Sequence, residues 1–323
     1  MKLFLHRIIA WIVTFFMLVS GCLSGTNHWD LPSDYRARIS GIELYENTLE
    51  TAQPQTKIYD LLTAHFKSAL PEGKTAKKAI VIGYDGCRAD LLSLTGKAEK
   101  SAIRTLLENG GHAVLSYCGG VNYPYLNTQA TSTAPGWCSM LTGAWADVHG
   151  ITDNGQEKSN DHLTLLTTLV QDGTVGASAF YVSWPGHFSG ENTTYYREKQ
   201  YIEQNKIAAD FVCAADDAGT KQNVLANLEQ ADCADFIFSI FEYCDHDGHA
   251  TGFDLQNENY VRAFRESEQT GREILETIAA RETFATEDWL VLITTDHGGF
   301  NRGHGHCTIQ ERYTFIVSNK EIA

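Results

Sequence analysis

Three acidic residues each follow directly after an apolar run, and histidines accompany two of them. The three segments are Tyr84-Asp85-Gly86, Cys244-Asp245-His246-Asp247-Gly248-His249 and Thr295-Asp296-His297-Gly298-Gly299. Because open α/β sheets bind ligands at the carboxyl ends of their strands, we expect these groups to converge at one edge. Converging carboxylates repel one another unless cations neutralise them. Carboxylates together with imidazoles suit zinc or another transition ion, so the pattern predicts a metal site.

A fourth segment, residues 131–143, contains a candidate nucleophile. Thr133 stands just before Pro135, in a turn that enters a predicted helix. A hydroxyl there lies near free backbone N–H groups and the positive end of the helix dipole, which together bind phosphate oxygens. Threonine is a weak nucleophile on its own, but coordination to a metal activates it. A plain helix cap is the alternative role for Thr133.

The hydrophobic pattern predicts the elements that must position these groups. Short buried runs predict strands at 79–84, 178–183, 236–241, 289–294 and 313–317. Helical spacing, caps and terminal glycines predict helices at 40–50, 57–69, 101–109, 160–171, 221–230 and 258–280. Alternating strands and helices are typical of an α/β fold, with a mostly parallel central sheet and helices on both faces.

Composition narrows the classes of partner. The chain has 323 residues, 43% of them hydrophobic, which is enough for a substantial core. Its 40 acidic residues exceed its 25 basic ones, giving a formal charge of -15. This balance argues against binding to a nucleic-acid duplex, which needs a cationic face. A small anionic substrate stays compatible, because metal ions reverse the local field.

The amino-terminal segment resembles an export signal. Lys2 and Arg7 precede an apolar stretch over 8–19, and small residues follow it. We therefore expect 1–21 to be a signal peptide, with a single membrane anchor as the alternative. Residues 19–22, Val-Ser-Gly-Cys, resemble the bacterial lipobox, which predicts lipidation of Cys22 as the first mature residue. The chain is then periplasmic or at the cell surface, held on a bacterial membrane by its lipid.

The same prediction bears on the remaining sequence and its cysteines. Residues 22–76 are predicted to be a tether and helical lead-in, and residues 77–323 a single catalytic domain. Seven cysteines remain besides Cys22, and export permits disulfides, although an odd number leaves at least one thiol unpaired. The sequence leaves both the pairing and the oligomeric state open.

Four motifs occur in an order that resembles the alkaline phosphatase superfamily, above all its type I phosphodiesterase/nucleotide pyrophosphatase branch. They are Tyr84-Asp85-Gly86, Thr133-Ala-Pro-Gly, Asp245-x-x-Gly-His249 and Asp296-His297-Gly298. The resemblance implies an alkaline phosphatase-like three-layer sandwich with two divalent ions, most simply zinc. Gly136 departs from the family, which usually has Asn there.

The resemblance also implies roles for individual residues. Asp85, Asp296 and His297 match the ligands of one zinc ion, which also binds the oxygen of Thr133. Asp245, His249 and a late histidine match the ligands of the other ion. His304, within Gly303-His304-Gly305, fits this late position best, and His306 is the alternative. Asn154 matches an asparagine that contacts a phosphate oxygen, although a turn residue is an equal interpretation.

The implied activity is hydrolysis of a phosphodiester or phosphoanhydride bond in a small substrate such as a nucleotide. Thr133 would form a covalent phospho-threonine, while the Ala134 N–H and Asn154 hold the remaining oxygens. A phosphomonoesterase or phosphonate hydrolase of the same superfamily is the nearest alternative. A sulfatase is disfavoured, because position 133 is neither Cys nor Ser and position 137 is Trp instead of Arg. A non-catalytic metal- or ligand-binding surface lipoprotein is the alternative from another class.

Overall fold

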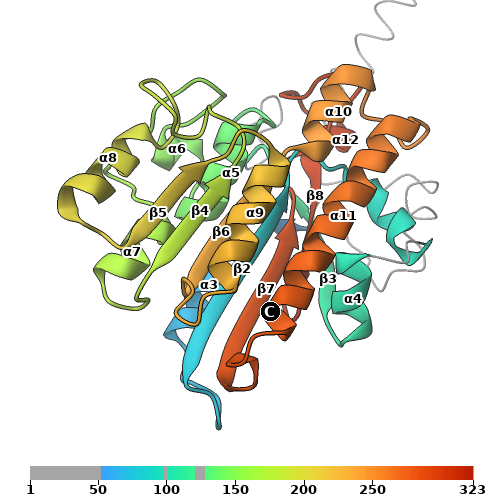
Figure 1. The fold of residues 1–323 in the computed structure, drawn as a ribbon. Coiled ribbons are helices and arrows are strands. Elements are labelled where there is room, and N and C mark those ends of the chain that lie inside the picture. Colours follow the sequence, from blue (N-terminus) through green and yellow to red (C-terminus); the bar gives the residue numbers. More distant parts are fainter. Residues whose placement is uncertain (1–51, 98–100, 121–127, 323) are drawn as a thin grey trace, which may run out of the picture.

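The computed structural model describes residues 52–97, 101–120 and 128–322, and its centre is an eight-stranded sheet (Figure 1). The strand order is β1-β3-β8-β7-β2-β6-β4-β5. The strands are β1 Gln53–Pro54, β2 Ala76–Tyr84, β3 His112–Tyr117, β4 Ser178–Val182, β5 Ala209–Cys213, β6 Phe236–Phe241, β7 Glu287–Thr294 and β8 Tyr313–Ser318. Within this sheet β8 pairs antiparallel with both of its neighbours and the other pairs are parallel. The predicted mostly parallel sheet is confirmed.

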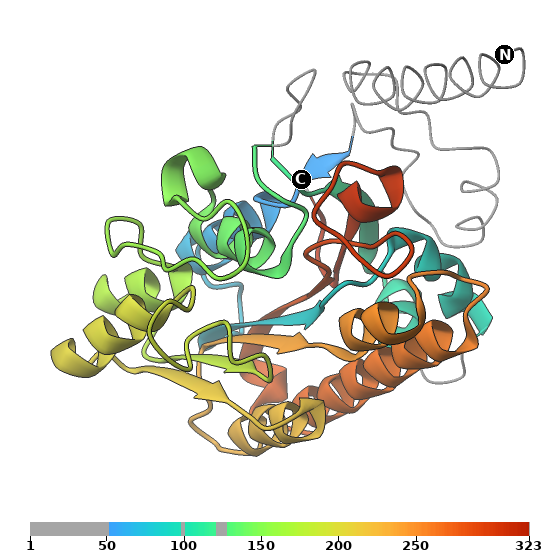
Figure 2. The same cartoon turned by 90° about the horizontal axis from the view of Figure 1, so that it is seen from above.

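Helices cover both faces of this sheet, as predicted (Figure 2). They are α3 Lys57–Lys67, α4 Ala102–Glu108, α5 Thr133–Thr142, α6 Ala146–His149, α7 Leu165–Gln171, α8 Tyr196–Asn205, α9 Asp217–Leu228, α10 Tyr243–Thr251, α11 Glu258–Ala279 and α12 Ile309–Arg312, with 3-10 turns at Ala89–Lys97 and Phe284–Thr286. Within the described residues, we find no helix whose length and apolar character would suffice to cross a membrane.

Strand β2 shows how the sheet divides the interior into two cores. Its residues alternate, so Ile80 and Ile82 pack on one side with α4, α9 and α11. Ala79 and Val81 pack on the other side with α3, α5 and α7. Successive side chains of a strand point to opposite faces, and burial on both faces produces the continuous apolar run seen in the sequence.

Helix α7 is shorter than the sequence predicts. The prediction of a helix over 160–171 is wrong at its start, since α7 begins at Leu165. The preceding turn is held by a fully buried ion pair between Lys158 and Glu198, whose atoms lie 3.0 Å apart. Glu198 also accepts hydrogen bonds from the backbone and hydroxyl of Thr164 at 2.9 and 2.7 Å. These long-range contacts hold residues 158–164 in a turn, although the local sequence alone favours a helix from residue 160.

The amino-terminal predictions fall into two groups. The signal at 1–21, the lipidation site Cys22 and the helix at 40–50 lie outside the described residues and stay predictions. The lead-in helix appears as α3, and its Ile58 and Leu62 are fully buried against the sheet. Packed structure therefore begins ahead of residue 77.

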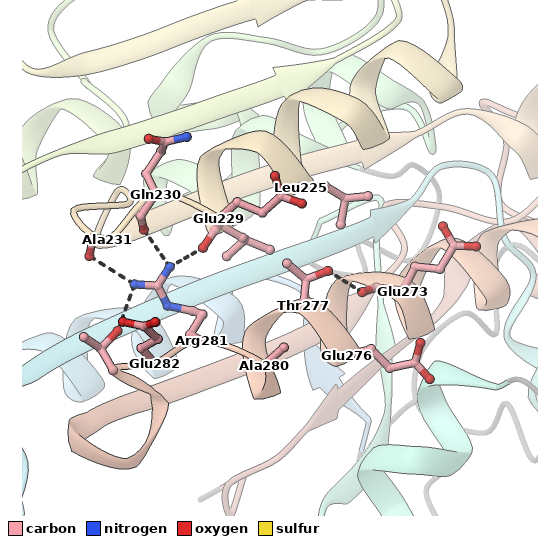
Figure 3. Close-up of a pocket in the computed structure, with 12 residues that line it drawn as sticks. Leu225, Glu229, Gln230, Ala231, Glu273, Glu276, Thr277, Ala280, Arg281 and Glu282 are labelled. Carbon is pink, nitrogen blue, oxygen red and sulfur yellow. Dashed lines mark hydrogen bonds between the residues drawn. The ribbon is translucent and has the colours of Figure 1, made fainter.

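A cavity of about 700 Å³ lies between the carboxyl ends of α9 and α11 (Figure 3). Arg281 borders it and forms a buried ion pair with Glu287, at 2.8 Å, in the first residue of β7. The same guanidinium donates to the backbone carbonyl of Gln230 at 2.9 Å. This cavity lies at the amino end of β7, the opposite edge of the sheet from the groups predicted to do chemistry.

Glu268 is a buried carboxyl in the middle of α11 that connects three elements. It accepts hydrogen bonds from the hydroxyl of Tyr84, at 3.2 Å, and from Ser101, the N-cap of α4. Burial raises the pKa of Glu268 to about 7, although both hydrogen bonds act in the opposite direction. An acid whose pKa is raised by folding is most stabilising while protonated, so this contribution falls as pH rises from about 4.5 through 7.

We predict that Glu268→Gln stabilises the protein at pH 8 relative to wild type and changes it little at pH 5. A neutral amide keeps hydrogen-bonding capacity without the cost of burying a charge, a difference of at most about 3 kcal/mol. Urea unfolding of the metal-loaded protein from pH 5 to pH 8 measures this difference. Glu266→Gln, at an exposed position two residues away, is the matched control. A stability difference that stays constant with pH would contradict the prediction.

Candidate metal centre

The three central strands deliver the predicted acids to one edge of the sheet. Strands β7, β2 and β6 are adjacent and parallel, so their carboxyl ends lie side by side. Asp85 directly follows β2, Asp296 lies two residues beyond β7, and Asp245 is in the first turn of α10 after β6. The expected convergence is therefore present in the structure.

The first cluster consists of Asp85, Asp296 and His297. All three residues are fully buried. His297 Nε2 lies 3.6 Å from Asp85 Oδ1 and 3.4 Å from Asp296 Oδ2. One ligand atom from each residue falls within 4.8 Å of the others, a spacing that a single metal ion could bridge.

The second cluster consists of Asp245, His249 and His304. Asp245 and His249 are four residues apart on α10, so both side chains lie on one face of that helix. The Nε2 atoms of His249 and His304 lie 3.5 and 3.6 Å from the two carboxylate oxygens of Asp245. The rings of His297 and His304 stack with centroids 4.0 Å apart, so the two clusters adjoin.

His304, and not His306, joins the second cluster. Residues 300–312 lead into β8, whose amino end lies at the same edge as the carboxyl ends of β2, β6 and β7. This segment therefore passes the site, and within it His304 is the residue that contacts Asp245. The backbone N–H of His306 instead donates to Glu311 Oε1, and its carbonyl accepts from Thr131.

The histidine nitrogens of both clusters are suited to bind divalent cations. Nδ1 of His249, His297 and His304 each lies 2.7–3.0 Å from a backbone carbonyl, which can only accept. Each Nδ1 therefore carries the proton, and each Nε2 presents a lone pair. Two such lone pairs, on His249 and His304, face each other at 3.0 Å.

The carboxylates show the same need for positive charge. The buried oxygens Asp85 Oδ1, Asp245 Oδ1 and Asp296 Oδ2 have no hydrogen-bond partner. Burial, and next the charge of Asp245, raise the pKa of Asp85 well above its usual range. Burial likewise raises the pKa of Asp296 and lowers that of His297. A set of acceptors without donors fits bound cations, which supply the missing charge.

Thr133 lies where the two clusters and the start of α5 meet. It is the first residue of α5, after Ser132 as N-cap, and only 4% of it is exposed. Its Oγ1 lies 3.5 Å from His297 Nε2, beside the first cluster. The sequence-based position near the helix start is confirmed.

Asn154 also lies at the start of α5, but its contact differs from the one expected. Its Oδ1 accepts from the Ala134 N–H at 2.8 Å. In this structure that N–H is therefore engaged by Asn154 and does not face the site independently. The amide nitrogen of Asn154 is the group left to contact a substrate oxygen.

Sequence reasoning missed two side chains that contact the site. Glu242, directly after β6, groups with Asp85 and Asp245, and its buried Oε1 lacks a hydrogen-bond partner. An acid at the end of an apolar strand was the signal used for the other three, so the same criterion would have found it. Trp137 donates from Nε1 to Asp85 Oδ2 at 2.7 Å, which orients that carboxylate. Nothing in the sequence distinguishes this tryptophan from core packing.

Comparison with known sequences identifies a family. The family model for type I phosphodiesterase / nucleotide pyrophosphatase matches residues 79–301. This match contains Asp85, Thr133, His249 and His297, and ends shortly before His304. No curated protein matches the chain significantly.

Several solved structures are similar in part. Murine ectonucleotide pyrophosphatase / phosphodiesterase 5 is 17% identical over 68% of this chain and 57% of its own length, with a TM-score of 0.48. The zinc complex of the C-terminal periplasmic domain of EcEptC from Escherichia coli is 13% identical, over 79% of this chain and 78% of its own, at 0.43. Alkaline phosphatase from the Antarctic bacterium TAB5 is 11% identical, over 76% and 91%, at 0.45.

The chain thus spans little more than half the length of the murine protein. Structural similarity at these TM-scores does not indicate an activity. The assignment depends on the family model, which covers more than half of the chain and contains the site motifs on three central strands and α5. The chain belongs to the type I phosphodiesterase / nucleotide pyrophosphatase family.

Proposed function

We propose that this protein hydrolyses phosphodiester or phosphoanhydride bonds in small substrates, nucleotides among them, through a phospho-threonine on Thr133. The observation that carries the proposal is the position of the Thr133 hydroxyl. It stands at the start of a helix, 3.5 Å from His297 Nε2 and beside two clusters of unsatisfied acceptors.

The residues suited to hold two divalent cations are Asp85, Asp296 and His297 for one and Asp245, His249 and His304 for the other. Carboxylate and imidazole donors favour zinc. When bound, such ions act as Lewis acids that offset phosphate charge and increase the acidity of a nearby hydroxyl. This chemistry explains why a threonine can serve as the nucleophile.

In the proposed reaction, Thr133 Oγ1 attacks phosphorus in line with the leaving oxygen. The Oγ1–P bond forms as the bond from phosphorus to the leaving group breaks, and the leaving oxygen gains a proton. Water then attacks the same phosphorus, the Oγ1–P bond breaks, and Thr133 recovers its proton. The net reaction adds one water across one phosphate ester or anhydride bond.

The local charge favours a diester over a monoester. Asn154, whose side chain contacts the first turn of α5, is neutral, while the protein as a whole carries a formal charge of -15. A diester brings one negative charge to this site, and a monoester dianion brings two. Additional positive charge would be required to stabilise the dianion equally well.

We predict that Thr133→Ala lowers turnover by more than about a thousandfold, because the attacking atom is lost. Bound zinc, measured by elemental analysis, should stay near the wild-type level, since six other side chains remain as ligands. Thr142→Ala, at the far end of α5, is the matched control and should retain activity. Wild-type turnover in Thr133→Ala would eliminate the proposed nucleophile.

A panel of three esters tests the reaction class. We expect bis-p-nitrophenyl phosphate to be hydrolysed faster than p-nitrophenyl phosphate, with p-nitrophenyl sulfate slowest. A chelator should abolish the activity and zinc should restore it, because the ligand clusters lack other compensating charge. Preference for the monoester would replace our proposal by a phosphomonoesterase. Absence of turnover on all three esters would favour the binding lipoprotein.

Asn154 offers a test of the substrate contact that keeps its structural contact. In Asn154→Asp, a carboxylate oxygen can still accept from the Ala134 N–H, but the amide donor is lost. We predict that kcat/KM falls by about a hundredfold, the typical cost of one missing donor at a developing charge. The midpoint of thermal unfolding should change little. An unchanged kcat/KM would show that Asn154 serves as a turn residue and helix cap.

A further inference from the structure

Asn154 is followed by Gly155 in an exposed turn beside the start of α5, and the chain has one other Asn-Gly pair, Asn109-Gly110 at the end of α4. Both pairs are exposed. In an Asn-Gly pair the backbone nitrogen of glycine can attack the asparagine side chain, because glycine has no β-carbon to block the approach and its backbone adopts many conformations. The two pairs therefore place the same chemistry in two different settings of one fold.

The turn at Asn154 is fixed at its base and open at its tip. At the base, the Gln156 side chain accepts from the Thr152 N–H at 2.8 Å and donates to the Thr152 hydroxyl at 2.9 Å. At the tip, Gly155 has a φ of 74°, and a β-carbon built on it would meet no atom within 4 Å. Within the described residues, no acceptor binds the Gly155 N–H. The attacking nitrogen is therefore available.

The fold also activates the group that would be attacked. Asn154 Oδ1 accepts from the Ala134 N–H at 2.8 Å, in the first turn of α5. The positive end of the helix dipole lies at this point. A donor already aimed at a carbonyl oxygen stabilises the negative charge that develops there when a nucleophile attacks the carbon. The contact that holds Asn154 beside the site thus favours attack on its side chain.

Asn109 has neither feature in the part of the chain that the structure describes. It is the C-cap of α4, and its amide nitrogen donates to the Thr105 carbonyl at 2.8 Å. The Gly110 N–H donates to the Leu107 carbonyl at 3.2 Å, which occupies the attacking nitrogen. Attack at Asn109 therefore requires these two hydrogen bonds to break first.

We propose that Asn154 is a modification site at which the folded chain deamidates spontaneously. The Gly155 nitrogen attacks Cγ of Asn154 and its proton passes to the departing amide, so the N–Cγ bond forms, the Cγ–Nδ2 bond breaks and ammonia leaves. The product is a cyclic succinimide. Water, the only co-reactant, then adds to either carbonyl of the ring and opens it. One product has aspartate at position 154, and the other has isoaspartate, whose main chain runs through the former side chain.

The consequence for catalysis rests on the proposed function. Either product replaces the neutral amide donor of Asn154 by a carboxylate, which adds a negative charge beside the start of α5. That charge repels a phosphate substrate. Isoaspartate also inserts one additional carbon into the main chain of the turn. Each molecule thus loses its activity once and without return, so this site limits the working lifetime of the protein.

Peptide mapping of aged protein tests the modification itself. The full chain, loaded with zinc, is incubated at pH 8 and digested at intervals at mildly acidic pH, which suppresses further deamidation. We expect the Asn154 peptide to gain the mass difference between a hydroxyl and an amino group, and to accept methyl groups from a protein isoaspartyl methyltransferase. The Asn109 peptide should change about tenfold more slowly, because its two hydrogen bonds must break first. An unmodified Asn154 peptide, or equal or faster conversion of Asn109, would overturn the proposal.

A variant and a solvent control separate the fold from the local sequence. Gly155→Ala is the matched variant, since its β-carbon hinders the attack and meets open space. Its Asn154 peptide should stay largely unmodified over the same period. In concentrated urea, the two wild-type peptides should convert at similar rates, because the fold no longer distinguishes them. Conversion of Gly155→Ala at the wild-type rate, or the same difference between the two peptides in urea, would contradict the proposed route.

Turnover in the same samples connects the modification to the site. We expect the loss of kcat/KM during ageing to follow the modified fraction of Asn154 and to be absent from Gly155→Ala. Modification without a loss of kcat/KM would disprove the limit on lifetime and the substrate contact of Asn154. The mass and methylation readouts do not depend on hydrolysis. Failure of the modification is therefore distinct from failure of the proposed activity.

Discussion

The main physical constraint on this structure is the repulsion among buried carboxylates at the carboxyl ends of the central strands. Asp85, Asp245 and Asp296 arrive on neighbouring parallel strands or just beyond them, and Glu242 joins them. Burial raises the pKa of Glu242 well above its usual range, and the charge of Asp85 acts in the same direction. Such a group is stable in its charged form only beside cations, so the fold is expected to be most stable with its metals bound.

Much of the surrounding chain holds this arrangement in place. Gly136 allows α5 to approach so closely that a β-carbon there would lie 2.9 Å from the β-carbon of Asp296. Gly83 similarly leaves room for Trp137, whose indole then reaches Asp85. Gln55, from the segment after β1, donates to the carbonyl of Gly136 at 3.0 Å. The departure at Gly136 thus has a physical reason, since the close contact between α5 and the Asp296 segment excludes a side chain.

The elements whose signals are local were predictable. Strand β6 matches its prediction at 236–241, and α11 begins and ends within one residue of the helix predicted at 258–280. Strands β3 and β5, and helix α8, were missed because their sequences lack a long apolar run or a clear period. The start of α7 was misplaced because the Lys158–Glu198 pair, formed across the fold, overrides a local helical pattern.

The sequence by itself determined the fold class, the three strand-end aspartates and the threonine at the start of a helix. These depend on periodicity and on short motifs, which are local properties of a chain. Only the tertiary structure decided that His304 joins Asp245 and that Asn154 occupies the Ala134 N–H. Both contacts join segments that lie apart in the sequence, and the first depends on the direction of β8. Packing of the complete sheet sets that geometry, and no local pattern records it.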